Sequence, residues 1–504
     1  MSPLLPVLVL LGAAVIIVLV DPLMRGAGAR EGGGVIAGIA FFLSLILLAS
    51  QASAGNQASI YTIFGPESPL TASMKLDILS LYFSMIFCGV GLAAAVYSIR
   101  YMILERETGL DRYYPLLLTL IAGMVGVTVA NDFFTLYVFW ELMAISSYSL
   151  VSFRKWSWEA VEAGFKYLVM STLGSLSALF GIALLYGLTG SLRFDVIRAS
   201  VFSGGNPAAT LSLAMIIIGF GVTAAVVPFH SWLPDAHPAA PTPISAVLSG
   251  VVIKTGVYAM LWSLFKVFTP LHYGFGAILM GLGVLTMTFA NVVAVMQSDV
   301  KRFLAYSSIA NIGYIVTGMG IAAYVLNRYP DQLSVAALAL TGALFHILNH
   351  ALGKGLSFLS VGCYIVRAES REISELEGIG AKMPMTTASL GIGLLNLAGV
   401  PPLSGFWSKL FIISAGLGIP SDALMFTITL IFVLNSILAA GYYLWFLQRI
   451  AFRKGSGEKH SRVREAPPLM LAPLIALASA CILITIMLGP VLQFIQSALE
   501  VVIG

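Results

Sequence analysis

Long apolar segments separated by short polar ones run along almost the whole chain. A helix needs roughly 20 apolar residues to cross about 30 Å of hydrocarbon. The segments lack period-two alternation, and in lipid only helices or closed barrels satisfy the backbone, so we expect an all-α protein without strands. The fourteen expected helices cover residues 4–20, 34–50, 77–98, 113–130, 132–153, 161–187, 211–233, 242–265, 273–296, 303–326, 333–366, 385–416, 420–447 and 469–499.

The composition agrees with a polytopic membrane protein. The 504 residues are 59% apolar and only 10% charged, and the mean hydropathy is +0.94. So little charge does not suit a water-soluble domain. The net charge of +4 is modest and no basic run is flanked by aromatic residues, which argues against nucleic-acid binding.

Two further features fit the same class. The first residues, MSPLLPVLVLLGAAVIIVLVD, lack a basic segment and a small-residue cleavage site, so we expect a retained first helix. Cys88, Cys363 and Cys481 lie inside apolar segments without metal-ligand spacing, and we interpret them as small core residues.

The basic residues indicate the orientation of the chain. If successive helices cross the membrane in opposite directions, all odd-numbered loops lie on one side. Eighteen Lys and Arg lie in these loops and only five in the even-numbered loops. The positive-inside rule then predicts both termini outside the plasma membrane of a prokaryote. The eighteen are Arg25, Arg30, Arg100, Arg106, Arg112, Arg154, Lys155, Lys301, Arg302, Arg367, Arg371, Lys382, Arg449, Arg453, Lys454, Lys459, Arg462 and Arg464, and the five are Lys75, Arg193, Arg198, Lys266 and Arg328.

The remaining four lysines, and one glutamate, lie inside expected helices. They are Lys166, Lys254, Lys354, Lys409 and Glu141. A charge at the bilayer centre costs about 2.5–3.5 kcal/mol or more, so such residues are functional candidates. Alternatively, each is an isolated residue of the core. A lysine near a helix end can also extend its long side chain to the membrane–water interface.

Two histidines extend this set. His346 and His350 precede Lys354 at intervals of four, which places the three on one helical face. Burial and neighbouring charges shift the pKa of such groups, so they suit a proton path. Metal binding by the two histidines is the weaker alternative, because no carboxylate or cysteine accompanies them.

Prolines interrupt two expected helices. Pro228 breaks 211–233 within VVPFH, and Pro401 and Pro402 break 385–416 within AGVPPLSGF. Each break is the fourth helix of a set of five, helices 4–8 and 9–13, which is typical of inverted-repeat transporters with the ion site at the breaks. His230 follows the first break and is either part of that site or a helix-capping residue.

These observations divide the chain into four parts. We expect helices 1–3 in residues 1–112, a first five-helix half-channel in 113–266, a second in 267–450, and a basic cytoplasmic loop with helix 14 in 451–504. The sequence contains no GxGxxG, P-loop, HExxH or nucleophile elbow, so we expect no cofactor or catalytic site in this chain.

Five long motifs carry a family resemblance across roughly residues 75–450. WELMAISSYSL, PFHSWLPDAHPAAPTPISAVLSGVVIKTGVYAML, SDVKRFLAYSSIANIGYIVTGMG, FHILNHALGKGLSFL and AGVPPLSGFWSKL occur in this order. The chain thereby resembles the antiporter-like membrane subunits shared by complex I (NADH–quinone oxidoreductase), Mrp-type cation/proton antiporters and membrane-bound energy-converting hydrogenases. The resemblance implies fourteen helices with two inverted five-helix bundles.

The resemblance also implies residue roles. Glu141 matches the glutamate of the fifth helix, which couples to a lysine of the seventh, and Lys254 matches the central lysine of the eighth. His230 matches the histidine of the PFH motif. Lys409 matches the charged residue at the break of the twelfth helix, which faces the outer exit, and His346, His350 and Lys354 match the relay of the eleventh.

One position departs from the family pattern. The lysine of the seventh helix stands five residues before the motif proline, and this chain has Thr223 there. A threonine hydroxyl can line a water chain but cannot change its charge. Either Lys166 or Lys254 substitutes for the missing lysine, or the first half-channel is altered, carries a different ion or does not pump.

Three functions fit these residues. The first is a proton- or sodium-translocating subunit of a redox-driven complex, whose iron–sulfur partners hold the cofactors that this chain lacks. The second is a subunit of a Mrp-type Na⁺/H⁺ antiporter without redox partners. The third is a structural subunit that lost transport, which Thr223 suggests and the retained Glu141, Lys254, Lys354 and Lys409 oppose.

The Thr223→Lys variant tests the departure. If Thr223 impairs the first half-channel, restoring the lysine should change the number of ions moved per turnover of the complex, measured in membrane vesicles. An unchanged ratio would favour compensation by another group.

Overall fold

The computed structural model describes residues 2–26, 31–53, 59–62, 72–201, 205–453 and 463–503. Arg30, Lys454, Lys459 and Arg462 of the orientation argument lie outside these residues. The described chain is almost entirely helical, and eleven of its helices are long and apolar enough to cross a membrane. The expected all-α polytopic architecture is confirmed.

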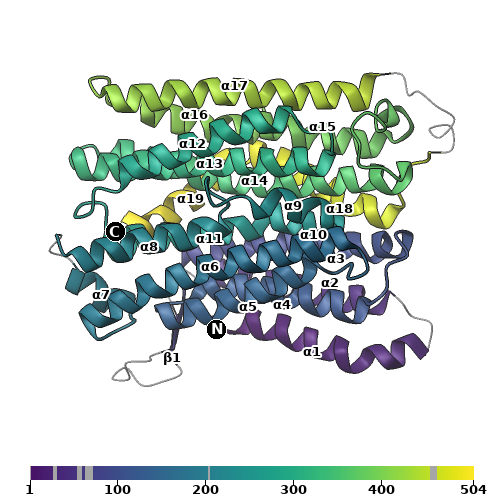
Figure 1. The fold of residues 1–504 in the computed structure, drawn as a ribbon, viewed down its shortest axis with the longest axis horizontal. Coiled ribbons are helices and arrows are strands. Elements are labelled where there is room, and N and C mark those ends of the chain that lie inside the picture. Colours follow the sequence, from purple (N-terminus) through teal and green to yellow (C-terminus); the bar gives the residue numbers. More distant parts are fainter. Residues whose placement is uncertain are drawn as a thin grey trace.

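Most of the helices lie side by side and run in roughly the same direction (Figure 1). The N-terminal part contains α1 (Leu5–Gly26), α2 (Gly32–Ser53) and α3 (Ile78–Leu104). Next come α4 (Leu110–Val129), α5 (Phe133–Val151), α6 (Trp158–Thr189), α7 (Phe194–Val201), α8 (Pro207–Thr223) and α9 (Trp232–Ala239). A continuous helical stretch follows, made of α10 (Thr242–Val247), the π-helical turn η1 (Leu248–Val252), α11 (Ile253–Trp262) and the π-helical turn η2 (Ser263–Phe268).

The second half has the same kind of elements. They are α12 (Gly276–Val295), α13 (Val300–Arg328), α14 (Leu333–Ala368), the short 3₁₀ helix η3 (Ile379–Lys382), α15 (Pro384–Ala398), α16 (Ser404–Gly416) and α17 (Ala423–Phe452). The chain then forms α18 (Pro468–Ile486) and α19 (Leu488–Ile503), so the expected fourteenth helix is divided near Met487. Each of the other expected helices has a counterpart, with the seventh and twelfth interrupted.

The expectation of no strands is wrong for one loop. Strands β1 (Ser59–Thr62) and β2 (Ser73–Leu76) pair antiparallel between α2 and α3. They lie at one end of the bundle, the end that also carries α7 (Figure 1). The argument from lipid applies only to spanning segments, and a hairpin in a loop can pair its backbone groups locally or with water.

The two five-helix sets have the same local geometry at opposite ends. Asp132 caps α5 and forms an isolated antiparallel β-bridge with Arg193, just after α6. Asp299 caps α13 and forms the same kind of bridge with Glu372, just after α14. Five crossings separate the two aspartates, which puts them at opposite ends of the bundle. The second set is therefore an upside-down copy of the first.

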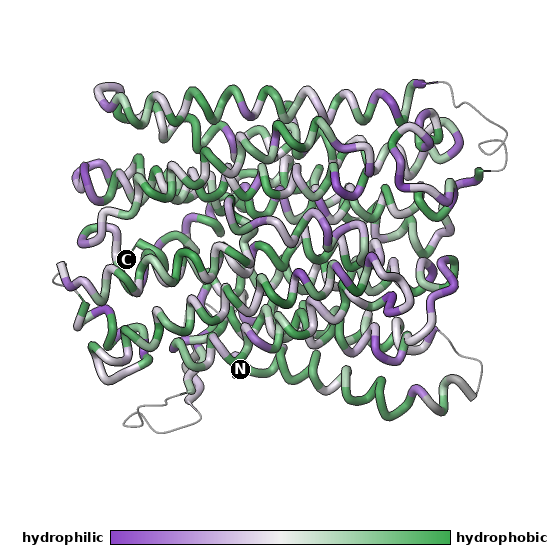
Figure 2. Tube along the Cα trace, viewed as in Figure 1, coloured by the Kyte–Doolittle hydropathy of each residue, from purple (hydrophilic) through white to green (hydrophobic). Residues whose placement is uncertain are grey.

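Hydropathy follows this arrangement. Hydrophilic residues gather at the two ends of the helices, apolar residues cover most of their length, and a smaller set of polar residues lies inside the bundle (Figure 2). The exposed large residues on α6, such as Phe165 at 64% and Leu173 at 57%, are apolar, as a lipid-facing surface requires.

Glycines allow α12 and α13 to approach closely. A Cβ on Gly283 would lie 2.7 Å from Thr317 N and 2.9 Å from Gly313 O of the facing helix. A Cβ on Gly281, on the same helix, would meet nothing within 4 Å. Small residues of this kind let membrane helices pack backbone to backbone.

We expect Gly283→Ala to lower the thermal unfolding midpoint of the purified complex, because overpacking typically costs about 1–3 kcal/mol. Gly281→Ala is the matched control and should leave the midpoint unchanged. Equal midpoints for both variants would contradict the close approach of α12 and α13.

Candidate functional site

The two helix breaks differ in what bonds to their free carbonyls. In the second, the Lys409 ammonium on α16 donates to Leu397 O at 3.0 Å and Ala398 O at 3.1 Å, the last carbonyls of α15. A cation is favourable there because a helix C-terminus carries partial negative charge. In the first, Trp232 Nε1 donates to Val222 O at 2.8 Å, next to the buried Thr223 that ends α8.

Lys254 lies at the centre of the bundle on α11 and is fully buried. Its ammonium donates to Ser249 O in the preceding π-helical turn. A π-turn departs from the regular α-helical bonding pattern, and such turns are frequent at functional sites. The Ser249 hydroxyl lies 2.6 Å from the Ser308 hydroxyl of α13, which extends the polar contacts to the second half.

Lys354 on α14 meets the same segment of α13. Ser308 Oγ donates to Leu304 O at 2.7 Å, and the fully buried Lys354 ammonium donates to the same carbonyl at 2.9 Å. Lys354 also donates to Ser307 Oγ. The two central lysines are thus joined through hydroxyl and carbonyl groups rather than through a carboxylate.

From Lys354 the polar contacts continue toward the second break. Asn311 Nδ2 donates to Ser307 O at 2.7 Å, and Asn311 Oδ1 lies 3.0 Å from His346 Nε2. His346 Nδ1 lies 2.9 Å from Ser408 Oγ, one residue before Lys409. Both ring nitrogens of His346 therefore have protein partners.

Three contacts of aromatic rings complete this region. The Lys409 ammonium lies 5.0 Å from the centre of the Tyr314 ring, and that ring lies 5.9 Å from the His346 ring. His350 stacks on His346 with 6.3 Å between ring centres. His350 is fully buried, and neither of its ring nitrogens has a hydrogen-bond partner among the described residues. Buried polar atoms are normally hydrogen-bonded, so both nitrogens need water as a partner.

We call the set from Lys254 to Lys409 the central polar row. Its members come from α10–α11, α13, α14 and α16, and all are buried. They are Ser249, Lys254, Ser307, Ser308, Asn311, His346, His350, Lys354, Ser408 and Lys409.

Glu141 does not join the central polar row by any contact among the described residues. It is half-buried on the outward face of α5, one helical turn from Val138 and Ile145, each 50% exposed. Its Oε1 has no hydrogen-bond partner among the described residues. Glu141 is thus a carboxyl group on the side of the bundle, near outward-facing apolar residues and close to Tyr137 and Tyr148 of the same helix.

Lys166 and His230 also lie away from the central polar row. Lys166 is 48% exposed and pairs with Glu162 at 2.8 Å and Asp235 at 3.1 Å. His230 lies in the turn between α8 and α9, half-buried, with its ring 5.0 Å from Phe289 and Nδ1 unpartnered among the described residues. Lys166 thus reaches toward the polar end of the bundle.

Sequence reasoning missed several members and misplaced one lysine. The serines, Asn311 and Ser408 lie within the quoted motifs, but small polar residues in helices give no signal until the facing helix is known. Lys301, expected in a loop, lies in the first turn of α13, is 2% exposed and donates to Ala240 O at 2.8 Å. Its burial follows from the packing of α9 against α13.

The comparisons agree with this architecture. The family described as NADH:quinone oxidoreductase/Mrp antiporter matches residues 130–435, and that described as NADH-Ubiquinone oxidoreductase (complex I), chain 5 N-terminus, matches residues 66–114. A chain in the structure of the membrane-bound sulfane sulfur reductase, an archaeal respiratory membrane complex, superposes with a TM-score of 0.84 at 28% identity, covering 100% of this chain and 98% of that one.

Two curated relatives have similar identity. Hydrogenase-4 component B of Escherichia coli (strain K12) is 31% identical over 425 residues, 82% of this chain and 62% of the relative. Na(+)/H(+) antiporter subunit A1 of Staphylococcus aureus (strain JH9) is 31% identical over 464 residues, 90% of this chain and 57% of the relative. The chain thus spans about three fifths of the length of these relatives.

Two broken helices in inverted sets, with lysines buried between them, define an antiporter-like membrane subunit. The chain belongs to the NADH:quinone oxidoreductase/Mrp antiporter transmembrane family, whose model covers more than half of its residues. The resemblance drawn from the motifs is confirmed.

We expect Asn311→Leu to lower the thermal unfolding midpoint of the complex. The change leaves the buried Nε2 of His346 without its partner, and such a loss typically costs about 1–3 kcal/mol. Asn327→Leu, at the exposed end of the same helix, is the control. A midpoint no lower for Asn311→Leu than for Asn327→Leu would count against the contact with His346.

Proposed function

We propose that this chain moves protons across the cell membrane along the central polar row, as a subunit of a larger redox-driven complex. The observation that carries the proposal is the continuity of the row, since contacts within hydrogen-bond distance lead from Lys254 through Lys354 to Ser408 beside Lys409. Two of these links end on backbone carbonyls, Ser249 O and Leu304 O, which only accept hydrogen bonds. The protons therefore pass between the titratable side chains through hydroxyls and intervening water.

Electrostatics couples the lysines of the row. The buried lysines have no carboxylate partner among the described residues, so a proton on one raises the cost of a proton on the next. Protonation at Lys254 therefore favours release from Lys354, and the direction of movement comes from the reaction that drives the complex. The break at α15 and α16 is the exit, and the positive-inside rule puts that exit, and both termini, outside the cell.

The coupling partners lie in other subunits. The relatives named above include a hydrogenase component and a chain of a respiratory complex, which supports other membrane subunits and iron–sulfur redox subunits as partners. Glu141 and Lys166 lie outside the row and act at its entry, and Thr223 and His230 line the first break. Sodium is the alternative ion.

A second candidate is a subunit of a Na⁺/H⁺ antiporter without redox partners. The similarity to antiporter subunit A1 favours it. Mass spectrometry of the proteins that co-purify in mild detergent separates the two, because only the first predicts iron–sulfur subunits. The third candidate, a structural subunit with an impaired first half-channel, predicts no ion movement through this chain.

Lys409→Ala should reduce proton movement in membrane vesicles at least tenfold while the complex stays assembled, because the exit loses its proton-carrying group. A pH-sensitive dye and a native gel give the two measurements. Lys382→Ala, at an exposed lysine of η3, is the control and should behave as the unchanged protein. Proton movement at the unchanged rate in Lys409→Ala would exclude Lys409 as the exit.

A further inference from the structure

A groove between α3, α14 and α18 lies on the side of the bundle, outside the central polar row. It has a volume of about 540 Å³, and none of its lining residues has a polar side chain. It is open on one side, where Ala472 and Ala476 of α18 are exposed and Leu348 and Leu352 of α14 are half-buried. We call it the apolar groove.

The apolar groove runs along the helices. Its lining extends from Met85 to Val96 on α3 and from Ala472 to Ile484 on α18. At 1.5 Å per residue, each stretch is about 17–18 Å long. One leaflet of a bilayer contributes about 15 Å of hydrocarbon, half of the total of about 30 Å. The groove therefore has the length of a single lipid acyl chain.

The width of the apolar groove also suits an acyl chain. Small residues at intervals of four leave its space open, Gly89 and Ala93 on α3 and Ala472, Ala476 and Ala480 on α18. A Cβ on Gly89 would meet nothing within 4 Å. A helix about 10 Å wide and 18 Å long would fill roughly 1,400 Å³, more than twice the volume of the groove.

Two arginines lie beyond one end of the groove, on α3 and α14. Arg100 follows Val96 by four residues, which places it one helical turn further on the same face of α3. Tyr97 Oη lies 3.4 Å from Cys363 Sγ, so α3 and α14 are in contact at this level. Arg367 follows Cys363 by four residues, in the last turn of α14. Arg100 and Arg367 thus lie at the same end of the two packed helices.

A third arginine precedes α18 at this end. Arg367 Nη2 donates to Glu465 O at 2.9 Å, which brings the end of α14 next to Arg464. The Glu465 carboxylate is already occupied, because it accepts from Met385 N at 2.8 Å and from Thr386 Oγ1 at 2.6 Å. Each of the three helices around the groove therefore has an arginine at the same end.

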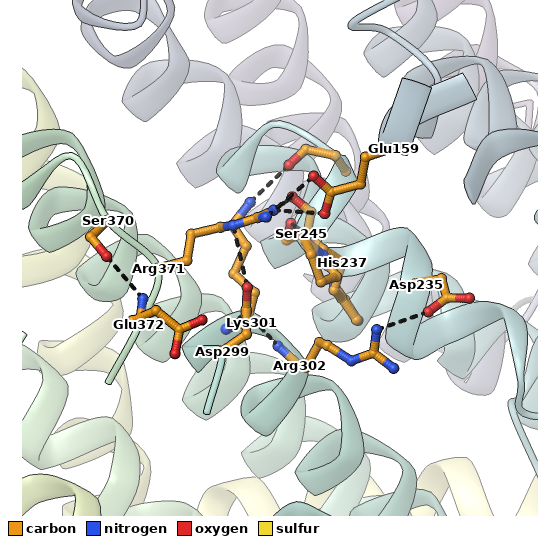
Figure 3. Close-up of polar contacts among 12 residues, drawn as sticks. Glu159, Asp235, His237, Ser245, Asp299, Lys301, Arg302, Ser370, Arg371 and Glu372 are labelled. Atoms are coloured by element: carbon orange, nitrogen blue, oxygen red, sulfur yellow. Dashed lines mark hydrogen bonds and ion pairs between the residues drawn. The ribbon is translucent and has the colours of Figure 1, made fainter. Parts of the chain in front are cut away.

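These arginines differ from others at this end of the bundle. Arg371, four residues after Arg367, forms an ion pair with Glu159 at 3.0 Å (Figure 3). Arg100 is half-buried and Arg464 is exposed, and neither forms an ion pair or hydrogen bond with another described residue. Their positive charges are left for a partner outside the chain.

We propose that the apolar groove binds one anionic phospholipid, with an acyl chain between α3 and α18 and the phosphate at Arg100, Arg367 and Arg464. Guanidinium groups match phosphate oxygens in charge and geometry. The positive-inside rule puts this end of the bundle in the cytoplasm, and the leaflet on that side carries anionic lipids. The site does not depend on whether the chain moves protons.

The bound lipid would cover the outer side of an important helix. Leu348 and Leu352 line the groove, and at 3.6 residues per turn they lie on the face of α14 opposite His346, His350 and Lys354. The acyl chain thus closes the outside of the helix whose inner face carries these titratable groups.

Photolabelling of the assembled complex tests the site without a variant. The complex is placed in phosphatidylcholine vesicles with a trace of phosphatidylglycerol, which is anionic, or of zwitterionic phosphatidylethanolamine, each carrying a photoreactive group in its acyl chain. Mass spectrometry compares labelling of residues 85–96 with labelling of the exposed face of α6. We expect phosphatidylglycerol to label 85–96 preferentially, whereas α6 should show no preference.

Two outcomes of this experiment would overturn the proposal. Equal labelling of 85–96 by the two lipids would make the groove an ordinary part of the lipid-facing surface. Labelling of 85–96 by neither lipid would mean that another subunit covers the groove.

Arg100→Gln combined with Arg464→Gln should lower the labelling of 85–96 by phosphatidylglycerol roughly tenfold, because the phosphate loses two cationic partners. Arg106→Gln combined with Arg112→Gln is the matched control, since it removes two exposed arginines from the same end of the bundle. Equal losses in both double variants would mean that labelling follows the general surface charge, which contradicts a headgroup site.

Gly89→Leu tests the groove itself. The leucine side chain has room there and takes the place of the acyl chain, so labelling of residues 472–484 by phosphatidylglycerol should fall. Gly281→Leu on α12, where a Cβ also meets nothing within 4 Å, should leave this labelling unchanged. A native gel checks assembly. Undiminished labelling of 472–484 in assembled Gly89→Leu would show that the acyl chain lies elsewhere.

Discussion

The structure depends on how three lysine ammonium groups are kept inside an apolar bundle without carboxylate partners among the described residues. Each instead donates to a backbone carbonyl. Lys254 does so at a π-turn, Lys354 at Leu304 O and Lys409 at the end of α15. Dipoles of this kind stabilise a charge less than an ion pair would, so each lysine can lose its proton at a lower cost than a salt-bridged one. The helix breaks, the π-turn and the serines of α13 are the irregularities that these cations require.

The inverted repeat explains why the irregularities occur where they do. Because the second set of five helices is turned over relative to the first, its broken helix presents its free carbonyls toward the opposite membrane surface. The first break and the break with Lys409 therefore face opposite ends of the bundle. Asp235 and Arg371 form ion pairs that join the first set of helices to the second at the end of the bundle near α9. A movement of one set relative to the other would change the lengths of these ion pairs.

Much of this arrangement could be predicted from the sequence because hydropathy and proline are strong, local signals. The spanning helices, both breaks and the burial of Lys254, Lys354 and Lys409 all follow from segments of about twenty residues. The serines and Asn311 could not be assigned, since an ordinary helix also contains such residues. Their role depends on which helix they face. Glu141 is the opposite case. The sequence singles it out as a charge inside an apolar segment, but it has no contact with the central polar row among the described residues.

The contact of Lys409 with the end of α15 links chemistry to shape. The ammonium group on α16 donates hydrogen bonds to the two terminal carbonyls of α15. When this nitrogen becomes neutral, it keeps two hydrogens for the two carbonyls but no longer complements the negative end of the α15 dipole. The attraction between the two half-helices is then weaker. The charge on one side chain thus sets how strongly the two parts of a single transmembrane segment hold together.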